Sequence, residues 1–229
     1  MREIVMDTET TGLDPSTGDR IVEIGGVELH NHMPTGKTYH QYINPKRDMP
    51  EGAFAVHGLS AEFLSDKPVF KDIAQGFLDF IGDSKLVIHN ASFDMKFLNA
   101  ELKSVDRPEL PWAQAIDTLA IARKKFPGAQ NSLDALCRRF GITTERELHG
   151  ALLDSEILAE VYLELIGGRQ PDFALSVVAS QSGDKDGGED WEPPTRPAVL
   201  APRLSKTESE AHAEFVKNLG EKAVWKQFS

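Results

Sequence analysis

Residues 4–12 read IVMDTETTG, in which three apolar residues run straight into a segment with two acids, Asp7 and Glu9. The apolar run predicts a buried strand. Side chains two apart on a strand point to the same face, so the two carboxylates would lie side by side where the strand ends. A solvated strand terminus can carry such a pair. A strand buried on both faces, however, ends where carboxylates need compensation, and a bound cation supplies it. The stretch therefore predicts a central strand and a candidate metal site.

The composition is that of a soluble chain with one substantial core. Of the 229 residues, 40% are hydrophobic and 27% are charged, which suits one domain plus an appendage or two small domains. No apolar run approaches the roughly 18 residues that a membrane span needs, and no signal peptide precedes the first strand, so we expect a cytoplasmic protein without a membrane partner. The single cysteine, Cys137, is expected to be a buried structural thiol rather than a reactive one. The net charge of -11 argues against extensive phosphate contacts, so any nucleic-acid footprint should be short.

Strand and helix patterns alternate along the first 168 residues. Three strands separated by turn-rich segments predict an antiparallel meander, over residues 3–7, 20–29 and 37–45. A short apolar strand at 85–89 then runs into a helix with Asn90 or Ser92 as its cap, and this pattern recurs more weakly at 115–126. Other helical patterns cover 61–64, 70–81, 131–139 with its cap, and 151–166 before Gly167 and Gly168. The fold class is therefore α/β.

The composition changes after Gly168. Residues 176–204 are rich in Gly, Pro, Ser and Asp without sustained periodicity, which predicts a flexible linker. We therefore expect one folded domain over 1–175, the linker over 176–204 and a separate segment over 205–229. In that segment Ser205 and Glu208 have capping-box spacing before a short amphipathic helix, and such a helix usually needs a surface to dock on.

Two more acids and a histidine lie near predicted helix starts. Asp94 falls in the first turn of the helix after strand 85–89, where α/β sheets commonly build sites, although a helix N-terminus also favours a carboxylate on structural grounds. His149 and Asp154 are five residues apart, roughly 140° around a continuous helix. They converge only if His149 lies in the loop before the helix, as Gly150 permits. A lone loop histidine is also common at surfaces.

Four carboxylates and one histidine together meet the requirements of a two-metal site. Two divalent ions about 4 Å apart would activate a water and stabilise the leaving oxygen of a phosphoryl displacement. Ligation by oxygen alone favours Mg²⁺ or Mn²⁺ over zinc. The histidine would serve as the general base for the attacking water.

Three segments together resemble the exonuclease motifs of the DnaQ-like, DEDDh family. They are DTETTGLD (7–14), HNASFDMKFL (89–98) and HGALLDSEILAEVYL (149–163). With VHGLS (56–60) and NSLDALCRRFGI (131–142), residues 1–168 resemble the proofreading epsilon subunits of bacterial DNA polymerase III. The resemblance implies an RNase H-like fold, with a mixed central sheet flanked by helices, and 3′ to 5′ removal of nucleoside monophosphates from DNA. It also implies, by position, that the metal ligands are Asp7, Glu9, Asp94 and Asp154, and that His149 is the general base.

The resemblance also implies a pocket for the terminal nucleotide. Gly12 would let the backbone approach that nucleotide, and Leu13 would stack or wedge against its base, the alternative being simple packing of the turn. His57 would line the pocket or serve packing alone. The expected substrate-binding residues are Thr8, Thr10, Gly12, Leu13, His57, Asn90 and Phe93. Because a base with the ordinary histidine pKa of roughly 6.5 must be neutral to accept a proton, activity should decline on acidification through that region.

The C-terminal part of the chain predicts protein partners. Gln170, Phe173 and Leu175 have the spacing of the hexapeptide with which polymerase-associated proteins bind the sliding clamp, although plain helix-to-linker sequence is an equal alternative. Residues 205–229 resemble, less closely, the epsilon tail that docks on the polymerase alpha subunit. Alternatively, this helix folds back on its own domain. Whether a third core subunit binds the flank of the domain stays open.

Two other functions fit some of these residues. A DEDDh exoribonuclease that trims RNA ends would use the same metals and base, and would differ in its contacts to the 2′ position. Such a free-standing enzyme has no evident need of the tail. A nuclease-like domain that serves only as a structural polymerase subunit would have no reason to keep all five residues. We therefore expect the substrate to be a single-stranded or frayed DNA 3′ end, since a mispaired terminus frays cheaply.

Overall fold

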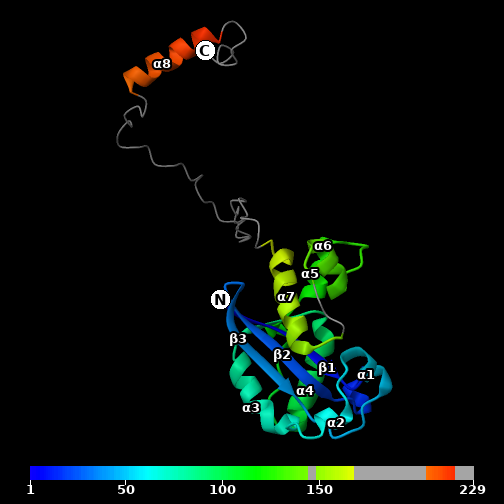
Figure 1. Cartoon of the computed structure of the whole chain (residues 1–229). Helices are drawn as coiled ribbons and strands as arrows, with labels where there is room; N and C mark the ends of the chain where they lie inside the picture. Colours follow the sequence, from blue (N-terminus) through cyan, green and yellow to red (C-terminus); the bar gives the residue numbers. More distant parts are fainter. Residues whose placement is uncertain (144–147, 168–204, 220–229) are drawn as a thin grey trace, which may run out of the picture. The chain divides into compact units, whose positions relative to one another are not determined.

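The computed structural model describes residues 1–143, 148–167 and 205–219. A five-stranded sheet of order β3-β2-β1-β4-β5 forms the centre of the fold (Figure 1). The strands are β1 (Arg2–Thr10), β2 (Ile21–His30), β3 (Met33–Tyr42), β4 (Lys85–Ile88) and β5 (Ala115–Asp117). The first three pair antiparallel, whereas β4 pairs parallel with both β1 and β5. The sheet is therefore mixed, with β1 at its middle.

Helices cover both faces of this sheet. They are α1 (Glu51–His57), α2 (Ala61–Leu64), α3 (Phe70–Ile81), α4 (Ala91–Ser104), α5 (Thr118–Lys125), α6 (Leu133–Phe140) and α7 (Ala151–Leu165). Ile4 and Met6 of β1 join apolar side chains of α3 and α4 in one core cluster, whereas Val5 packs with side chains of α7 in another. Strand β1 is thus buried on both faces, as its apolar run predicts.

The meander, the two strand-to-helix units and the α/β class are confirmed, but one strand is displaced from its predicted limits. Strand β3 begins at Met33 and ends at Tyr42, not over 37–45. The cause is a tight connection, because Asn31 and His32 have φ values of 50° and 66°. Positive φ at both central residues is the geometry of a two-residue hairpin turn, so the turn-rich segment before residue 37 is mostly strand.

Two further features depart from the prediction. Strand β1 spans Arg2–Thr10 and not only residues 3–7, so Glu9 lies within the strand and the acidic pair is not at its last residue. Helix α1 has no counterpart in the predicted elements. It spans only seven residues, and no side chain caps its N-terminus. Cys137 is buried, as expected of a structural thiol.

The chain divides into two units, Met1–Val177 and Val178–Ser229, and the described part of the second contains helix α8 (Lys206–Asn218). The Ser205 amide donates to the Glu208 carboxylate at 2.8 Å, and the Glu208 amide donates to the Ser205 hydroxyl at 3.2 Å. The predicted capping box is therefore confirmed. The predicted linker over 176–204 lies outside the described residues. None of the helices in the described ranges is long and apolar enough to cross a membrane.

Candidate active site

Strand β1 brings two acids to one side of the sheet. Asp7 and Glu9 lie on the side of β1 where Val5 meets α7, while Thr8 points to the opposite side, toward α4. Glu9 is only 8% exposed, and Asp7 keeps a partly exposed edge. The register with β2 shifts between Glu9 and Thr10, so regular pairing is interrupted immediately after the acidic pair.

Asp94 enters the same region from the first turn of α4. The chain passes from β4 into α4 through Asn90, whose φ of 67° is left-handed, a conformation that Asn tolerates better than most residues. Asn90 is the N-cap residue by its backbone, but its side chain makes no capping hydrogen bond. The Thr8 hydroxyl donates to Asp94 Oδ1 at 2.7 Å, and Asp94 is 2% exposed. Thr8 thus ties β1 to α4.

His149 and Asp154 converge as the spacing requires. His149 lies in the loop before α7, Gly150 is the extended N-cap residue, and Asp154 is in the first helical turn. His149 Nδ1 and Asp154 Oδ2 are 3.0 Å apart. Because an ionised carboxylate only accepts hydrogen bonds, the proton of a neutral His149 belongs on Nδ1 and its lone pair on Nε2.

All five predicted catalytic residues line one cavity of about 760 Å³. They are Asp7, Glu9, Asp94, His149 and Asp154. Ligand atoms of Glu9, His149 and Asp154 lie within 4.8 Å of one another, so the two carboxylates are close enough to share a metal ion and the histidine lies beside them. The chain therefore brings together residues that are up to 147 positions apart in the sequence, from Asp7 to Asp154.

The acids in this cavity disfavour one another's charge. Burial raises the pKa of Asp7 well above its ordinary value, and the neighbouring charges of Asp94, Glu9 and Glu23 raise it further. Burial also raises the pKa of Asp94 to about 7, although the hydrogen bond from Thr8 opposes the shift. Buried carboxylates that repel one another require a compensating positive charge. The donor set is rich in carboxylate oxygen and so fits hard divalent cations.

Glu23 is a neighbour of this cluster that sequence reasoning missed. Its Oε2 accepts a hydrogen bond from the Ala151 amide at 3.2 Å, and its Oε1 lies 2.6 Å from His40 Nε2. Gly25, two residues further along β2, lets the start of α7 approach this strand, because a Cβ there would lie 2.2 Å from the Ala151 carbonyl carbon. Glu23 therefore helps fix the helix that carries Asp154. A buried acid within the apolar stretch IVEIGG was the available signal.

A second, smaller cavity of about 490 Å³ adjoins the first. The two share Thr8, Glu9 and Phe93 in their linings. Of the other predicted substrate-binding residues, Thr10, Gly12, Leu13 and His57 line the smaller cavity, whereas Asn90 lines only the larger one. The predicted nucleotide pocket is thus divided between two spaces that meet beside Glu9.

His57 lines the smaller cavity and has one buried polar atom without a hydrogen-bond partner of ordinary geometry. Its Nδ1 accepts a hydrogen bond from the Leu59 amide at 3.0 Å, so the Nε2 atom carries the proton of the neutral ring. Nε2 is buried and has no hydrogen-bond partner of ordinary geometry. Burial lowers the pKa of His57, and the nearby Thr10 backbone offsets part of that effect.

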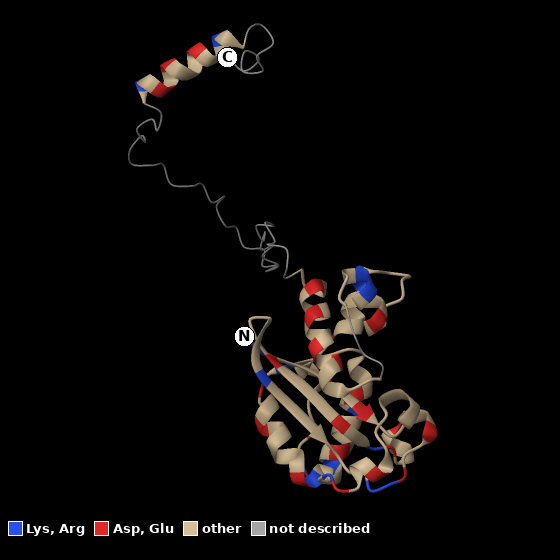
Figure 2. Cartoon of the chain, in the orientation of Figure 1, with Lys and Arg blue, Asp and Glu red and all other residues tan. Residues whose placement is uncertain are grey.

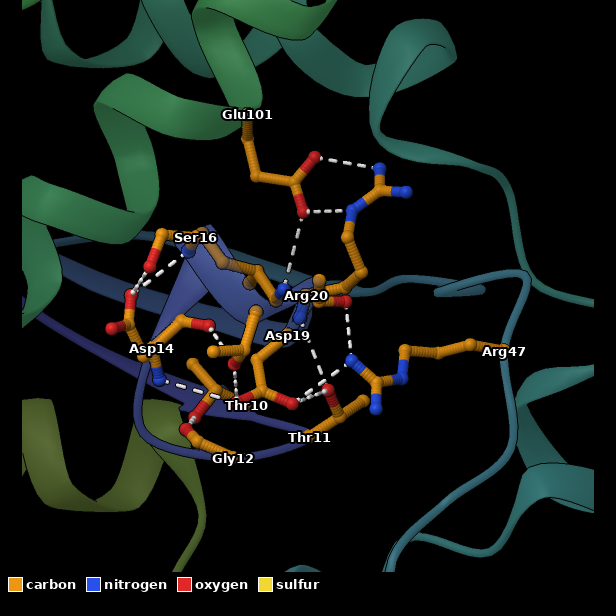
Figure 3. A network of polar contacts seen from close by, with 12 residues as sticks. Thr10, Thr11, Gly12, Asp14, Ser16, Asp19, Arg20, Arg47 and Glu101 are labelled. Carbon is orange, nitrogen blue, oxygen red and sulfur yellow. Dashed lines mark hydrogen bonds and ion pairs between the residues drawn. The ribbon is translucent and has the colours of Figure 1, made fainter.

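The loop that bears Leu13 is held by polar contacts around Asp19 (Figure 3). The Asp19 carboxylate accepts from the Asp14 amide at 3.2 Å and pairs with Arg47 at 2.9 Å. A Cβ at Gly12 would lie 2.3 Å from Asp19 Oδ2, which gives this glycine a structural reason beyond the expected approach to a nucleotide. Leu13 itself is 82% exposed at the mouth of the smaller cavity.

Comparison with known proteins agrees with this geometry. Residues 4–162 match a family model described as an exonuclease. The DNA polymerase III subunit epsilon of Rickettsia felis is 51% identical over 231 residues, which cover 96% of this chain and 97% of that protein.

Two solved structures share the fold. Exonuclease X in complex with 5′ overhanging duplex DNA has a TM-score of 0.58 at 28% identity, and covers 72% of this chain and 91% of its own. The nuclease domain of 3′hExo, a DEDDh family member bound to rAMP, has a TM-score of 0.64 at 19% identity, with coverages of 73% and 92%. The RNase H-like fold is therefore confirmed. The chain belongs to the exonuclease family and, within it, to the epsilon subunits of DNA polymerase III.

Proposed function

We propose that this chain is a 3′–5′ exonuclease that removes mispaired 3′-terminal nucleotides from DNA, as the proofreading subunit of a bacterial DNA polymerase III. The observation that carries the proposal is the convergence of four acids and His149 on one cavity, in a chain of the epsilon family. The products are nucleoside monophosphates, released one at a time.

In this proposal Asp7, Glu9, Asp94 and Asp154 hold two divalent ions, Mg²⁺ or Mn²⁺. Such ions, when bound, activate a water and stabilise the leaving oxygen of an in-line phosphoryl displacement. The raised pKa values of Asp7 and Asp94 support the assignment, because they mark carboxylates whose charge the protein leaves uncompensated. Thr8 orients Asp94 through its hydroxyl.

His149 serves as the general base. Its Nδ1–H donates to Asp154 across 3.0 Å, which fixes the ring and leaves the Nε2 lone pair for the proton of the attacking water. The side chain of His149 is 47% exposed, so water reaches the ring.

The smaller cavity receives the terminal nucleoside. Its walls are largely apolar, with Ala53, Val56 and Phe93 among them, and Leu13 stands at its mouth. The Nε2–H of His57, which has no hydrogen-bond partner of ordinary geometry, is a donor for a polar atom of that nucleoside. A cavity of this kind accepts an unpaired end and excludes a base-paired one, which accounts for selection of mispaired termini.

The partners follow the same proposal. Residues 205–229 dock on the polymerase alpha subunit. Phe215 of α8 and Leu219 directly after it support this, because they are 58% and 46% exposed and form no core of their own. Gln170, Phe173 and Leu175, the proposed contacts to the sliding clamp, lie outside the described residues. We leave binding of a third core subunit as a prediction, and we place the protein in the cytoplasm, where replication takes place.

The test is degradation of 5′-labelled DNA with paired or mispaired 3′ ends, and of matching RNA, in the presence of Mg²⁺. We expect mispaired DNA to shorten one nucleotide at a time, RNA to be degraded much more slowly, and Asp7→Asn to be inactive. RNA degraded as fast as DNA would favour an exoribonuclease. A native protein inactive on both would favour a structural subunit.

A further inference from the structure

The larger cavity extends well beyond the acid cluster. Its far wall comes from α5 and from the segment leading into α6, with Leu119, Arg123, Asn131 and Ser132 among the lining residues. The reaction proposed above uses none of these side chains. A space of about 760 Å³ is more than one scissile phosphate and its ions need.

Arg123 gives this far wall a positive charge. Within the described ranges it is the only Lys or Arg that lines the cavity, among the acids Asp7, Glu9, Asp94, Asp134 and Asp154. The residue is exposed, and across the described part of the chain no hydrogen bond or ion pair engages its guanidinium. Its charge acts on the adjacent His89, whose pKa it helps to lower. An arginine with an uncommitted guanidinium fork can hold a phosphate by two parallel hydrogen bonds.

Neighbouring cations differ from Arg123 in this respect. Helices α5 and α6 both end in basic turns, visible as the blue colour on α6 (Figure 2). Lys125 donates to the carbonyl oxygens of Glu164 and Leu165 at the end of α7, and Arg139 stacks 4.4 Å from the centroid of the Phe126 ring. Lys124 is exposed and does not line the cavity. Arg123 alone among these combines a place on the cavity wall with an unengaged head group.

The junction of the two cavities indicates in which direction the bound DNA strand would run. They meet at Thr8, Glu9 and Phe93, beside the acid cluster. With the terminal nucleoside in the smaller cavity and the scissile phosphate at the junction, the chain of the substrate continues in the 5′ direction into the larger cavity.

We propose that the larger cavity is the subsite for the penultimate nucleotide, and that Arg123 binds the phosphate immediately 5′ of the scissile one. This inference rests on the proposed function. The contact would be independent of base sequence, as phosphate contacts are, and would position the strand without requiring a broad basic surface. In a chain of net charge -11, one such local contact reconciles an anionic substrate with an acidic protein.

Three small substrates test the proposal without a polymerase. The dinucleotide d(pTpT) carries the phosphate that Arg123 would bind, d(TpT) lacks it, and the p-nitrophenyl ester of thymidine 5′-monophosphate lacks the penultimate nucleotide altogether. For native protein with Mg²⁺ we expect kcat/KM to be about tenfold higher for d(pTpT) than for d(TpT), the effect of one charge-assisted hydrogen-bonding contact.

The variants then assign that difference to a residue. Arg123→Ala should cleave both dinucleotides equally, while its cleavage of the p-nitrophenyl ester stays at the native rate, which also shows that the variant is folded. Arg123→Lys should retain part of the preference, and the matched control Lys124→Ala should retain all of it. A native-like preference in Arg123→Ala, or an equal loss on all three substrates, would overturn the subsite. Native protein that cleaves the substrates without preferring d(pTpT) would overturn the subsite alone, whereas native protein inactive on all three would overturn the proposed function as well.

Discussion

Two buried acids on the same helix, α4, have opposite environments. Glu101 is 3% exposed, and its carboxylate accepts from Arg20 at 2.7 and 2.8 Å and from the Ile21 amide at 3.2 Å (Figure 3). Asp94 is 2% exposed, and its carboxylate accepts a hydrogen bond from the neutral Thr8 hydroxyl at 2.7 Å. No Lys or Arg pairs with Asp94 in the described part of the chain. Folding therefore neutralises the first acid internally, whereas no cationic side chain of the described residues does so for the second. The difference separates a structural ion pair from the proposed metal-binding site.

Exchange of Asp94 and of Glu101 for the corresponding amide should give the largest difference in kcat. With Mg²⁺ present, Asp94→Asn should lower kcat on single-stranded DNA by about a thousandfold or more, since a metal site supplies several kcal/mol of transition-state stabilisation. Glu101→Gln should keep kcat close to the native value. Release of nucleotides from a 5′-labelled oligonucleotide measures both. Near-native turnover by Asp94→Asn would remove the distinction between the two acids.

A second substitution sharpens the comparison by separating chemistry from metal binding. His149→Ala should lower kcat between about a hundredfold and ten-thousandfold, the usual contribution of a general base. The Mg²⁺ concentration that gives half-maximal activity should change little, because the proposed ligands are the four carboxylates. His30→Ala, an exposed histidine at the end of β2, serves as the control. A large rise in the Mg²⁺ requirement of His149→Ala would instead make the histidine a ligand.

The free energy of unfolding should respond in the opposite order to kcat, with a larger effect of Glu101→Gln than of Asp94→Asn. Glu101→Gln leaves the Arg20 guanidinium without its charged acceptor and should lower the free energy of unfolding by about 2 kcal/mol. Urea denaturation without metal measures the loss. Asp94→Asn keeps an acceptor for the Thr8 hydroxyl, so it should not share this loss. Equal destabilisation by both variants would mean that Asp94 is also a structural acid.

The smallest expected effect is on the pH dependence of the melting temperature of the metal-free protein. Asp94, with its pKa raised to about 7, keeps its proton in the folded chain while the unfolded chain releases it near the ordinary value of 3.8. Its contribution to stability is therefore greatest at acid pH and is lost as pH rises through about 7. The melting temperature of Asp94→Asn should exceed that of native protein increasingly from pH 5 to pH 8, reaching roughly 3 °C, the shift that ~1 kcal/mol produces in a chain of this size. Because His57 and His89 titrate in both proteins, their effects cancel in the difference. A difference independent of pH would mean that the charge of Asp94 is not the cause.

The sequence predicts those parts of the site that depend on local pattern. Alternation places Asp7 and Glu9 on one side of β1, and the five-residue spacing of His149 and Asp154 requires a loop, which the structure has. Glu23 and Arg123 depend on contacts between distant elements. Glu23 matters because β2 lies against the start of α7, and Arg123 because the end of α5 borders the cavity. Neither contact leaves a periodic signal.

The errors in the predicted fold have a similar origin. Strand β3 begins early because Asn31 and His32 adopt left-handed backbone, which their side chains only permit and do not require. Helix α1 is short and lacks a capping side chain, so its sequence carries little local helix signal. A hydrogen bond between distant segments, from the His149 amide to the Val56 carbonyl at 3.1 Å, helps to hold it.

The most direct test of the account is calorimetric titration of the metal-free protein with Mn²⁺ at pH 8. The account predicts that native protein and Glu101→Gln both bind two ions, and that Asp94→Asn binds fewer or binds them much more weakly. Absence of Mn²⁺ binding by native protein, or binding that Asp94→Asn leaves unchanged, would contradict the claim that this buried acid belongs to a metal site.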